Sequence, residues 1–339
     1  NLPKILEVTL HDGLDPRTDK LIGLQTGDPR TFASYDRLFE AFTAQLHHFV
    51  DIKVRGNNII ERLYAERMPA PFLSLFVEDC IARGRDYNDG GPRYNSTYIQ
   101  ITAPGSCTDS LSALKAHVFD RRDLTMDEVL QAVDADFVGH EKTRLLLWNR
   151  SPKYGNDDPA ADDIMAQLFN AVFHEIDGRP NTKGGTCRVN FLSTTCHVYF
   201  GSVTGAMPDG RRAWQPLSDG ISPVQGADHN GPTAVVRSAA RLDHGRTGGT
   251  LLNQKFVPEL LEGDRGLDAL GHLIRSYFTM DGHHIQFNVV TAATLRAAQA
   301  EPDKYRDLIV RVAGYSDYFC DLTPALQEEI IARTEQQTF

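Results

Sequence analysis

The chain has 339 residues, of which 41% are hydrophobic and 24% charged, and its formal net charge is -10. This is the composition of a globular protein, and the acidic balance argues against a nucleic-acid phosphate backbone as a partner. No apolar stretch approaches the roughly 20 residues that a membrane span requires, so no membrane segment is predicted.

Four segments have the apolar spacing or the starting residues of helices. The apolar residues of 31–50 fall on one helical face. A capping box opens a predicted helix over 125–133. Two further helices, over 158–176 and 323–333, each begin with an N-cap residue followed by proline.

Short apolar runs between these helices favour buried strands, at residues 195–200, 250–253 and 285–290. Strands that alternate with amphipathic helices indicate an α/β fold with a parallel sheet. Residues 201–231 are rich in Gly, Pro and Asp, and we expect them to form a long ordered loop.

The five cysteines are scattered, and none forms a C-x-x-C pair. This is a poor disulfide framework and favours a reduced, cytoplasmic setting. The twelve histidines show no zinc-type spacing, so no metal is predicted. We expect His47-His48 and His283-His284 to be surface or hydrogen-bonded histidines.

The most informative segment is Arg311-Val312-Ala313-Gly314-Tyr315-Ser316, whose glycine stands 25 residues before the end of the chain. It follows the apolar run 308–310. Taken alone, Gly314 would be a turn glycine at a position where φ must be positive.

A wider set of residues closely resembles the C-terminal signature of glycyl radical enzymes. Downstream of the glycine it includes Tyr318-Phe319, Leu322, Gln327, Ile330-Ile331 and Arg333-Thr334. The resemblance extends over essentially the whole chain, through Thr26-Gly27-Asp28-Pro29, Lys153-Tyr154-Gly155-Asn156-Asp157-Asp158, Pro208-Asp209-Gly210-Arg211-Arg212, Gly231-Pro232-Thr233-Ala234-Val235, Gly249-Thr250-Leu251-Leu252-Asn253 and Gln286-Phe287-Asn288-Val289-Val290.

This resemblance implies that Gly314 stores a radical. A glycine α-carbon that loses a hydrogen is flanked by an amide nitrogen and a carbonyl, and delocalisation requires a planar centre that a Cβ would crowd. We expect Gly314 and its neighbours Arg311, Val312, Ala313, Tyr315 and Ser316 to form a buried loop that excludes water and oxygen. The resemblance also implies a separate activating enzyme that uses S-adenosylmethionine and an iron–sulfur cluster. Nothing in this chain is expected to bind either cofactor.

Members of this family pass the radical to a cysteine in a Gly-Cys-x-Glu setting. No cysteine of this chain stands in that setting, among Cys80, Cys107, Cys187, Cys196 and Cys320. Residues 2–13 resemble the helical segment that follows the cysteine loop. We therefore expect an N-terminal half that bears the catalytic cysteine, encoded upstream in the same gene or on a separate chain. It should dock on an exposed apolar face, and the assembly is expected to be a homodimer.

Two segments, 192–201 and 280–288, look most like the dehydratase branch of the family. The whole chain is most similar to trans-4-hydroxy-L-proline dehydratases, with glycerol and propanediol dehydratases next. The implied reaction eliminates water from a small hydroxylated molecule. Thr194 or Thr195 is a candidate to contact that substrate through its hydroxyl, the alternative being a strand threonine bonded to its neighbours.

Other readings stay open. The chain could belong to another glycyl radical lyase that cleaves C–N or C–S bonds, to an arylacetate decarboxylase or to a formate acetyltransferase-like enzyme. Anaerobic ribonucleotide reductase is disfavoured, because its zinc site needs C-x-x-C pairs. A non-catalytic spare-part protein that donates a radical domain is the hypothesis from another class, and the size of the chain argues against it.

The expected fold is α/β, the second half of a ten-stranded α/β barrel with the Gly314 loop reaching into its centre. Residues 1–200 are expected to form the C-terminal part of the barrel domain, and residues 201–339 the glycine radical domain.

Overall fold

A computed structural model describes all 339 residues, which form a mixed α/β protein. The helices are α1 (Leu2–Leu10), α2 (Tyr35–Arg67), α3 (Pro71–Phe76), α4 (Cys80–Arg83), α5 (Pro104–Leu114), α6 (Met126–Asp134), α7 (Glu141–Arg150), α8 (Pro159–Ile176), α9 (Cys196–Gly201), α10 (Gly231–Ala239), α11 (Gly263–Thr279), α12 (Ala292–Ala300) and α13 (Pro324–Ala332). The strands are β1 (Leu14–Asp15), β2 (Lys20–Leu21), β3 (Thr97–Gln100), β4 (Cys187–Phe191), β5 (Thr247–Thr250), β6 (Asn253–Phe256), β7 (Gln286–Val289), β8 (Ile309–Arg311), β9 (Ser316–Tyr318) and β10 (Glu335–Gln336).

The strands confirm the predicted parallel pairing. Strand β4 lies between β3 and β5 in one three-stranded parallel sheet. Strand β6 lies between β10 and β7 in a second one. Strands β8 and β9 form a separate antiparallel hairpin that carries Gly314. These are open sheets, so a closed ten-stranded barrel is not formed within this chain.

The predicted helices at 125–133, 158–176 and 323–333 are confirmed as α6, α8 and α13. The capping box of α6 is present in full, since the Thr125 and Glu128 side chains each accept the other residue's backbone N–H. Asp158 caps α8 by accepting the backbone N–H of Ala160. Local chemistry therefore sets where these helices begin.

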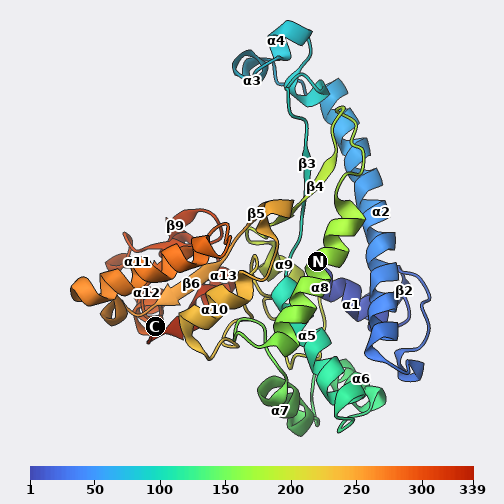
Figure 1. Ribbon diagram of the computed structural model, residues 1–339, viewed down its shortest axis with the longest axis vertical. Helices are drawn as coiled ribbons and strands as arrows, with labels where there is room; N and C mark the ends of the chain where they lie inside the picture. The colour runs from blue at the N-terminus through green and yellow to red at the C-terminus, as the bar shows by residue number, and fades with distance from the viewer.

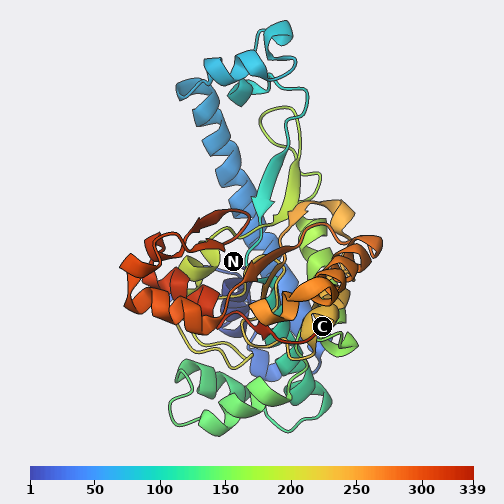
Figure 2. The same cartoon turned by 90° about the vertical axis from the view of Figure 1, so that its left-hand side faces the viewer.

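Helix α2 is longer than the predicted segment 31–50 and forms one side of an arm. Its first half is buried, with Leu38, Phe42 and Leu46 in the core. Its second half runs past the body to a tip made of α3 and α4 (Figure 1 and Figure 2). The tip exposes large apolar side chains, including Phe72 at 75% and Phe76 at 73%. Exposed apolar surface of this kind is typical of a docking face.

Two hydrophobic cores hold the molecule together. The larger one joins α1, α2, α5 and α8 to the first parallel sheet. The smaller one lies among α12, α13 and the β8–β9 hairpin, and includes Leu251, Leu295, Val310, Phe319 and Ile330. In Figure 1 the C-terminal segments, coloured orange to red, gather on the side of the molecule opposite α2.

Two strand predictions were wrong in detail. Residues 195–200 form most of the short helix α9, because the chain turns after β4 at Thr194, whose φ is 48°. Residues 250–253 contain the end of β5 and the start of β6, which belong to different sheets. The loop over 201–231 is ordered as expected. The buried Arg211 guanidinium donates to the carbonyl oxygens of Gly201 and Gly205, 2.9 and 2.7 Å away. None of the helices is both long and apolar enough to cross a membrane.

Candidate functional site

Gly314 lies at the tip of the β8–β9 hairpin. The strands pair Ile309 with Tyr318 and Arg311 with Ser316. Val312 extends the pairing by donating its backbone N–H to the Tyr315 carbonyl oxygen, 2.9 Å away. This leaves Ala313 and Gly314 as the two turn residues. Gly314 has a φ of 85°, in the left-handed region that favours glycine, so the predicted positive φ is confirmed.

The hairpin tip packs on one side only. A Cβ built on Gly314 would lie 3.4 Å from Leu251 Cδ1 and 3.6 Å from Leu192 Cδ1, so these leucines form its inner contact. Val312 and Ala313 are buried in the smaller core. Gly314, Tyr315 and Ser316 are exposed. The expectation of a fully buried loop is therefore wrong for this chain by itself, because no segment of it covers the outer side of the tip.

A cavity of about 390 Å³ opens beside Gly314. It lies at the carboxyl ends of β4 and β5, the edge of a parallel sheet where α/β proteins place their sites. Its walls come from both strands, from the leucines under the glycine and from a histidine pair, namely Asn190, Leu192, Gly248, Gly249, Thr250, Leu251, His283 and His284. Because Gly314 is part of its wall, this cavity is the candidate active site.

The histidine pair takes part in this cavity, which the sequence did not indicate. His283 is exposed, as expected for a surface histidine. His284 is half-buried, and its Nδ1 is buried without a hydrogen-bond partner. Burial lowers the pKa of His284, and the nearby Arg311 guanidinium lowers it further. His284 can therefore offer a neutral imidazole to the cavity.

Thr194 and Thr195 lie in the turn between β4 and α9 and are not part of the cavity wall. The Thr194 hydroxyl donates to the Ser193 carbonyl oxygen 2.7 Å away and lies 3.8 Å from Cys196 Sγ. Thr194 is exposed. A role for either hydroxyl in substrate binding stays a prediction.

The five cysteines are free thiols, and none of them lines the cavity beside Gly314. Cys80, Cys107 and Cys187 are buried, and burial raises the pKa of the Cys107 thiol. Cys196 is exposed at the start of α9. No cysteine of this chain is therefore placed to exchange a hydrogen with Gly314 across the cavity.

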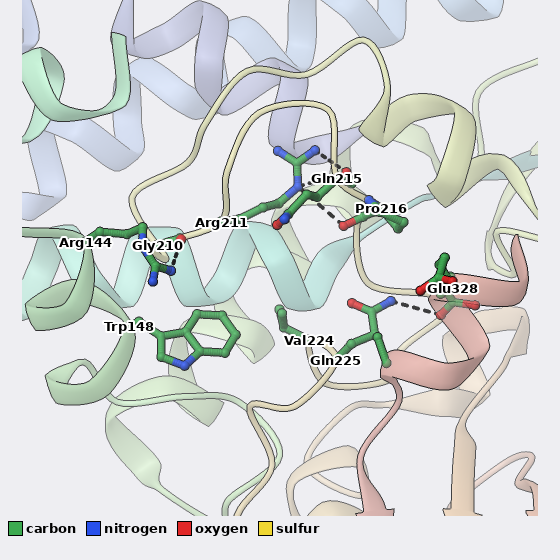
Figure 3. Close-up of a pocket in the computed structure, with 11 residues that line it drawn as sticks. Arg144, Trp148, Gly210, Arg211, Gln215, Pro216, Val224, Gln225 and Glu328 are labelled. Atoms are coloured by element: carbon green, nitrogen blue, oxygen red, sulfur yellow. Dashed lines mark hydrogen bonds between the residues drawn. The ribbon is translucent and has the colours of Figure 1, made fainter. Parts of the chain in front are cut away.

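A second cavity, of about 490 Å³, lies between α7, the 201–231 loop and α13 (Figure 3). Arg144, Trp148 and Gly210 lie along one side of it, and Gln225 reaches toward α13 from below. Gln225 donates to Glu329 Oε1 at 2.9 Å. The wall contains no residue of the β8–β9 hairpin, so this space is separate from the candidate active site.

Comparison with known proteins places the chain in a family. A family model described as pyruvate formate lyase-like matches residues 1–201, and one described as glycine radical matches residues 217–320. The chain is 55% identical over 336 residues to trans-4-hydroxy-L-proline dehydratase of Clostridioides difficile, covering 99% of this chain and 43% of that protein.

Solved structures agree. The crystal structure of hydroxyproline dehydratase from Clostridioides difficile with trans-4-hydroxy-L-proline bound matches with a TM-score of 0.97 at 55% identity. The glycerol-bound B12-independent glycerol dehydratase from Clostridium butyricum matches with a TM-score of 0.96 at 43% identity. Each match covers 99% of this chain and 43% of the other, so the chain spans less than half the length of these relatives. The chain belongs to the pyruvate formate lyase-like family of glycyl radical enzymes.

Proposed function

We propose that this chain is the radical-storing portion of a glycyl radical dehydratase, with the radical at Gly314. The observation that carries the proposal is the position of this glycine. It occupies a hairpin tip at a positive φ, lies against two leucines and opens onto a cavity at the ends of two parallel strands. Arg311, Val312, Ala313, Tyr315 and Ser316 form the loop around the radical.

The chain divides into two parts in this proposal. Residues 1–200 are the C-terminal part of a barrel domain, and residues 201–339 are the glycine radical domain. The two family models support the division because they match on either side of it. An N-terminal half that bears the thiyl cysteine, termed the front portion, would add further strands to the two open parallel sheets. The strands of both portions would together make the ten-stranded barrel.

The exposed outer side of Gly314 supports a front portion of this kind. A cysteine loop from it would cover the tip, place a sulfur near the glycine α-carbon and exclude oxygen. The apolar tip of the arm, with Phe72 and Phe76, offers further surface for docking. The assembly is proposed to be a cytoplasmic homodimer. Five free thiols are typical of a reducing compartment.

The substrate is proposed to be a small hydroxylated molecule, with trans-4-hydroxy-L-proline first and diols such as glycerol or propanediol second. The 55% identity with the hydroxyproline dehydratase over almost the whole chain favours the first. In such a reaction the thiyl takes a hydrogen atom from the carbon beside C–OH. The hydroxyl leaves with a proton as water, and the thiol returns the hydrogen atom. The neutral His284 imidazole is a candidate to hold or accept a proton near the cavity, and Thr194 or Thr195 is a candidate to bind a substrate hydroxyl.

Installing the radical is proposed to require a partner, which the match of residues 217–320 to the glycine radical family model supports. We propose a separate activating enzyme that uses S-adenosylmethionine and an iron–sulfur cluster.

An anaerobic activity screen of the complete enzyme tests the function. The activated enzyme is incubated with trans-4-hydroxy-L-proline, glycerol, 1,2-propanediol and choline, and the products are identified by mass spectrometry. Loss of one water from hydroxyproline, absent in Gly314→Ala, is the expected result. Cleavage of choline would indicate a C–N lyase instead. A spare-part protein would behave differently. The activated chain would carry the radical, but it would restore turnover only when added to a partner enzyme that lacks its own radical domain.

A further inference from the structure

The hairpin that carries Gly314 is not joined to either parallel sheet by backbone pairing. Strand β8 pairs only with β9, and both sheets end without it. The position of the glycine must therefore be set by other contacts. Side chains from three elements supply them, and their hydrogen bonds converge on Arg311 and Val312, the residues that lead into the tip.

The second sheet turns an unusual polar face toward the hairpin. Asn253 and Lys255 are two residues apart on β6, and Gln286 and Asn288 are two residues apart on β7, so each pair lies on one face of its strand. The register places Asn253 beside Gln286 and Lys255 beside Asn288. All four side chains are buried. Buried strand faces are normally apolar, and buried polar groups destabilise a protein unless they are hydrogen-bonded. We term these four residues the polar face. Within it the Gln286 amide donates to Asn253 Oδ1, and the other side-chain hydrogen bonds of the four residues go to partners outside the sheet.

Asn288 binds the backbone of Arg311 as a neighbouring strand would. Its Oδ1 accepts the Arg311 backbone N–H at 2.7 Å, and its Nδ2 donates to the Arg311 carbonyl oxygen at 2.8 Å. These are its only hydrogen bonds through the side chain. The Arg311 side chain is held as well, because its guanidinium donates to Gln286 Oε1 at 2.9 and 3.2 Å.

Arg333 binds the next residue from the end of α13. Its Nη2 donates to the Val312 carbonyl oxygen at 3.0 Å, and the Asn253 amide donates to the same oxygen at 3.3 Å. Arg333 is buried and is aimed by the buried Glu329 carboxylate, which accepts from its Nε at 3.0 Å and from its Nη2 at 2.8 Å. Burial by itself raises the pKa of Glu329, but the Arg333 charge outweighs this and lowers it, so the pair is ionised. A guanidinium fixed by a bidentate carboxylate holds its remaining donors in one direction.

We propose that Asn288 and Arg333 are positioning residues that fix the radical glycine. They hold the peptide groups of Arg311 and Val312, three and two residues before Gly314, and so keep its α-carbon against Leu251 and Leu192. The effect on catalysis rests on the proposed function, whereas the hydrogen bonds from Asn288 and Arg333 to the hairpin do not depend on the radical. Hydrogen transfer between a glycine and a cysteine depends on their separation, and a misplacement of about 1 Å costs on the order of 100-fold in rate.

Asn288→Ala is the sharpest test, because it removes both bonds to Arg311 without leaving a buried charge. The matched control is Asn181→Ala. Asn181 also holds backbone on both sides, accepting the N–H groups of Lys183 and Gly185 and donating to the Asn95 carbonyl oxygen, but it lies near the arm. If Asn288→Ala fails to fold, Asn288→Asp keeps the acceptor for the Arg311 N–H and puts a second oxygen in place of the donor, against the Arg311 carbonyl oxygen.

The first measurement is amide hydrogen exchange of the 339-residue chain. We expect the peptide that spans 309–318 to exchange on the order of 10-fold faster in Asn288→Ala, with α5 and α8 unchanged. Asn181→Ala should leave that peptide as in the wild type. Unchanged exchange in the hairpin, or equal acceleration along the whole chain, would overturn the proposal.

The second measurement separates positioning from folding, in the complete activated enzyme. Asn288→Ala is expected to keep radical spin within about twofold of the wild type while turnover falls by roughly 10-fold or more. If spin and turnover fall together, or if both are retained, the residue does not position the radical. A wild-type enzyme without spin at Gly314 would instead refute the proposed function, and the exchange result would stand.

Discussion

Replacing Gly314 by alanine separates the chemical role of this residue from its role in folding. The added Cβ would lie 3.4 Å from Leu251 Cδ1 and 3.6 Å from Leu192 Cδ1, which is ordinary van der Waals contact. No neighbour has to move. The remaining cost is the backbone, since φ is 85° and alanine at such an angle loses about 1–2 kcal/mol. The variant is therefore expected to fold with a modestly lower free energy of unfolding.

Gly178→Ala provides the matched control. Gly178 has a φ of 79°, and a Cβ there would meet nothing within 4 Å. Its backbone strain is the same as that of Gly314→Ala, so both variants should lose about 1–2 kcal/mol in urea denaturation. Gly178 lies in the turn after α8, outside the candidate site.

Electron paramagnetic resonance after anaerobic activation then distinguishes the two variants. Gly178→Ala should show the radical signal of the wild type, and Gly314→Ala should show none. A signal of full size in Gly314→Ala would place the radical elsewhere and refute the reasoning. If Gly314→Ala lowered the free energy of unfolding by more than about 4 kcal/mol, the added Cβ would clash with its neighbours, and the ordinary contact with Leu251 and Leu192 would be wrong.

Three further outcomes are expected. Exposing the activated enzyme to air should cut the chain at Gly314 and release a piece of about 25 residues. Intact mass spectrometry should find it only after activation, whereas ordinary proteolysis of a loop would not depend on activation. Replacing both Phe72 and Phe76 by serine should leave the unfolding free energy of this chain nearly unchanged, because both are exposed, yet weaken its binding to the front portion in a titration. Asp109→Asn should flatten the pH dependence of stability. Burial raises the pKa of Asp109 from 3.8 to about 7, so this group lowers stability as pH rises between about 4 and 7, and urea midpoints at pH 5 and pH 8 should converge in the variant.

The elements that the sequence predicted well are those set by nearby residues. The capping box at Thr125 and Glu128 and the Asp158-Pro159 start need only a few neighbouring residues, and both are present. The strand predicted over 285–290 is confirmed as β7, although its buried residues are the polar Gln286 and Asn288. Gly314 was singled out through its motif, and its φ of 85° agrees with the local requirement for glycine.

Predictions that depended on distant segments were less successful. The sequence of 195–200 suits a buried strand, but the turn at Thr194 ends β4 and starts α9 instead. The exposure of Gly314 could not be predicted either. What covers a hairpin tip is decided by segments far away in sequence, and here the covering side is left open. The place of His284 in the cavity wall has the same origin, since this wall forms only when β4, β5, the histidine pair and the Gly314 hairpin come together.

The polar face could be predicted only in part from the sequence. The alternation of Asn253 with Lys255 and of Gln286 with Asn288 is visible in the sequence, and physical chemistry requires such buried groups to be hydrogen-bonded. What the sequence leaves undecided is the partner, because Asn288 and Arg311 stand 23 residues apart. The structure shows that the partner is the Arg311 backbone, and this explains why the segment 286–290 carries a buried asparagine. Without the Asn288 amide and Arg333, a glycine with the same local motif would lose most of the hydrogen bonds that hold the backbone leading into it. The position of Gly314 thus depends on the second parallel sheet and on Arg333 after α13 as much as on the hairpin that carries it.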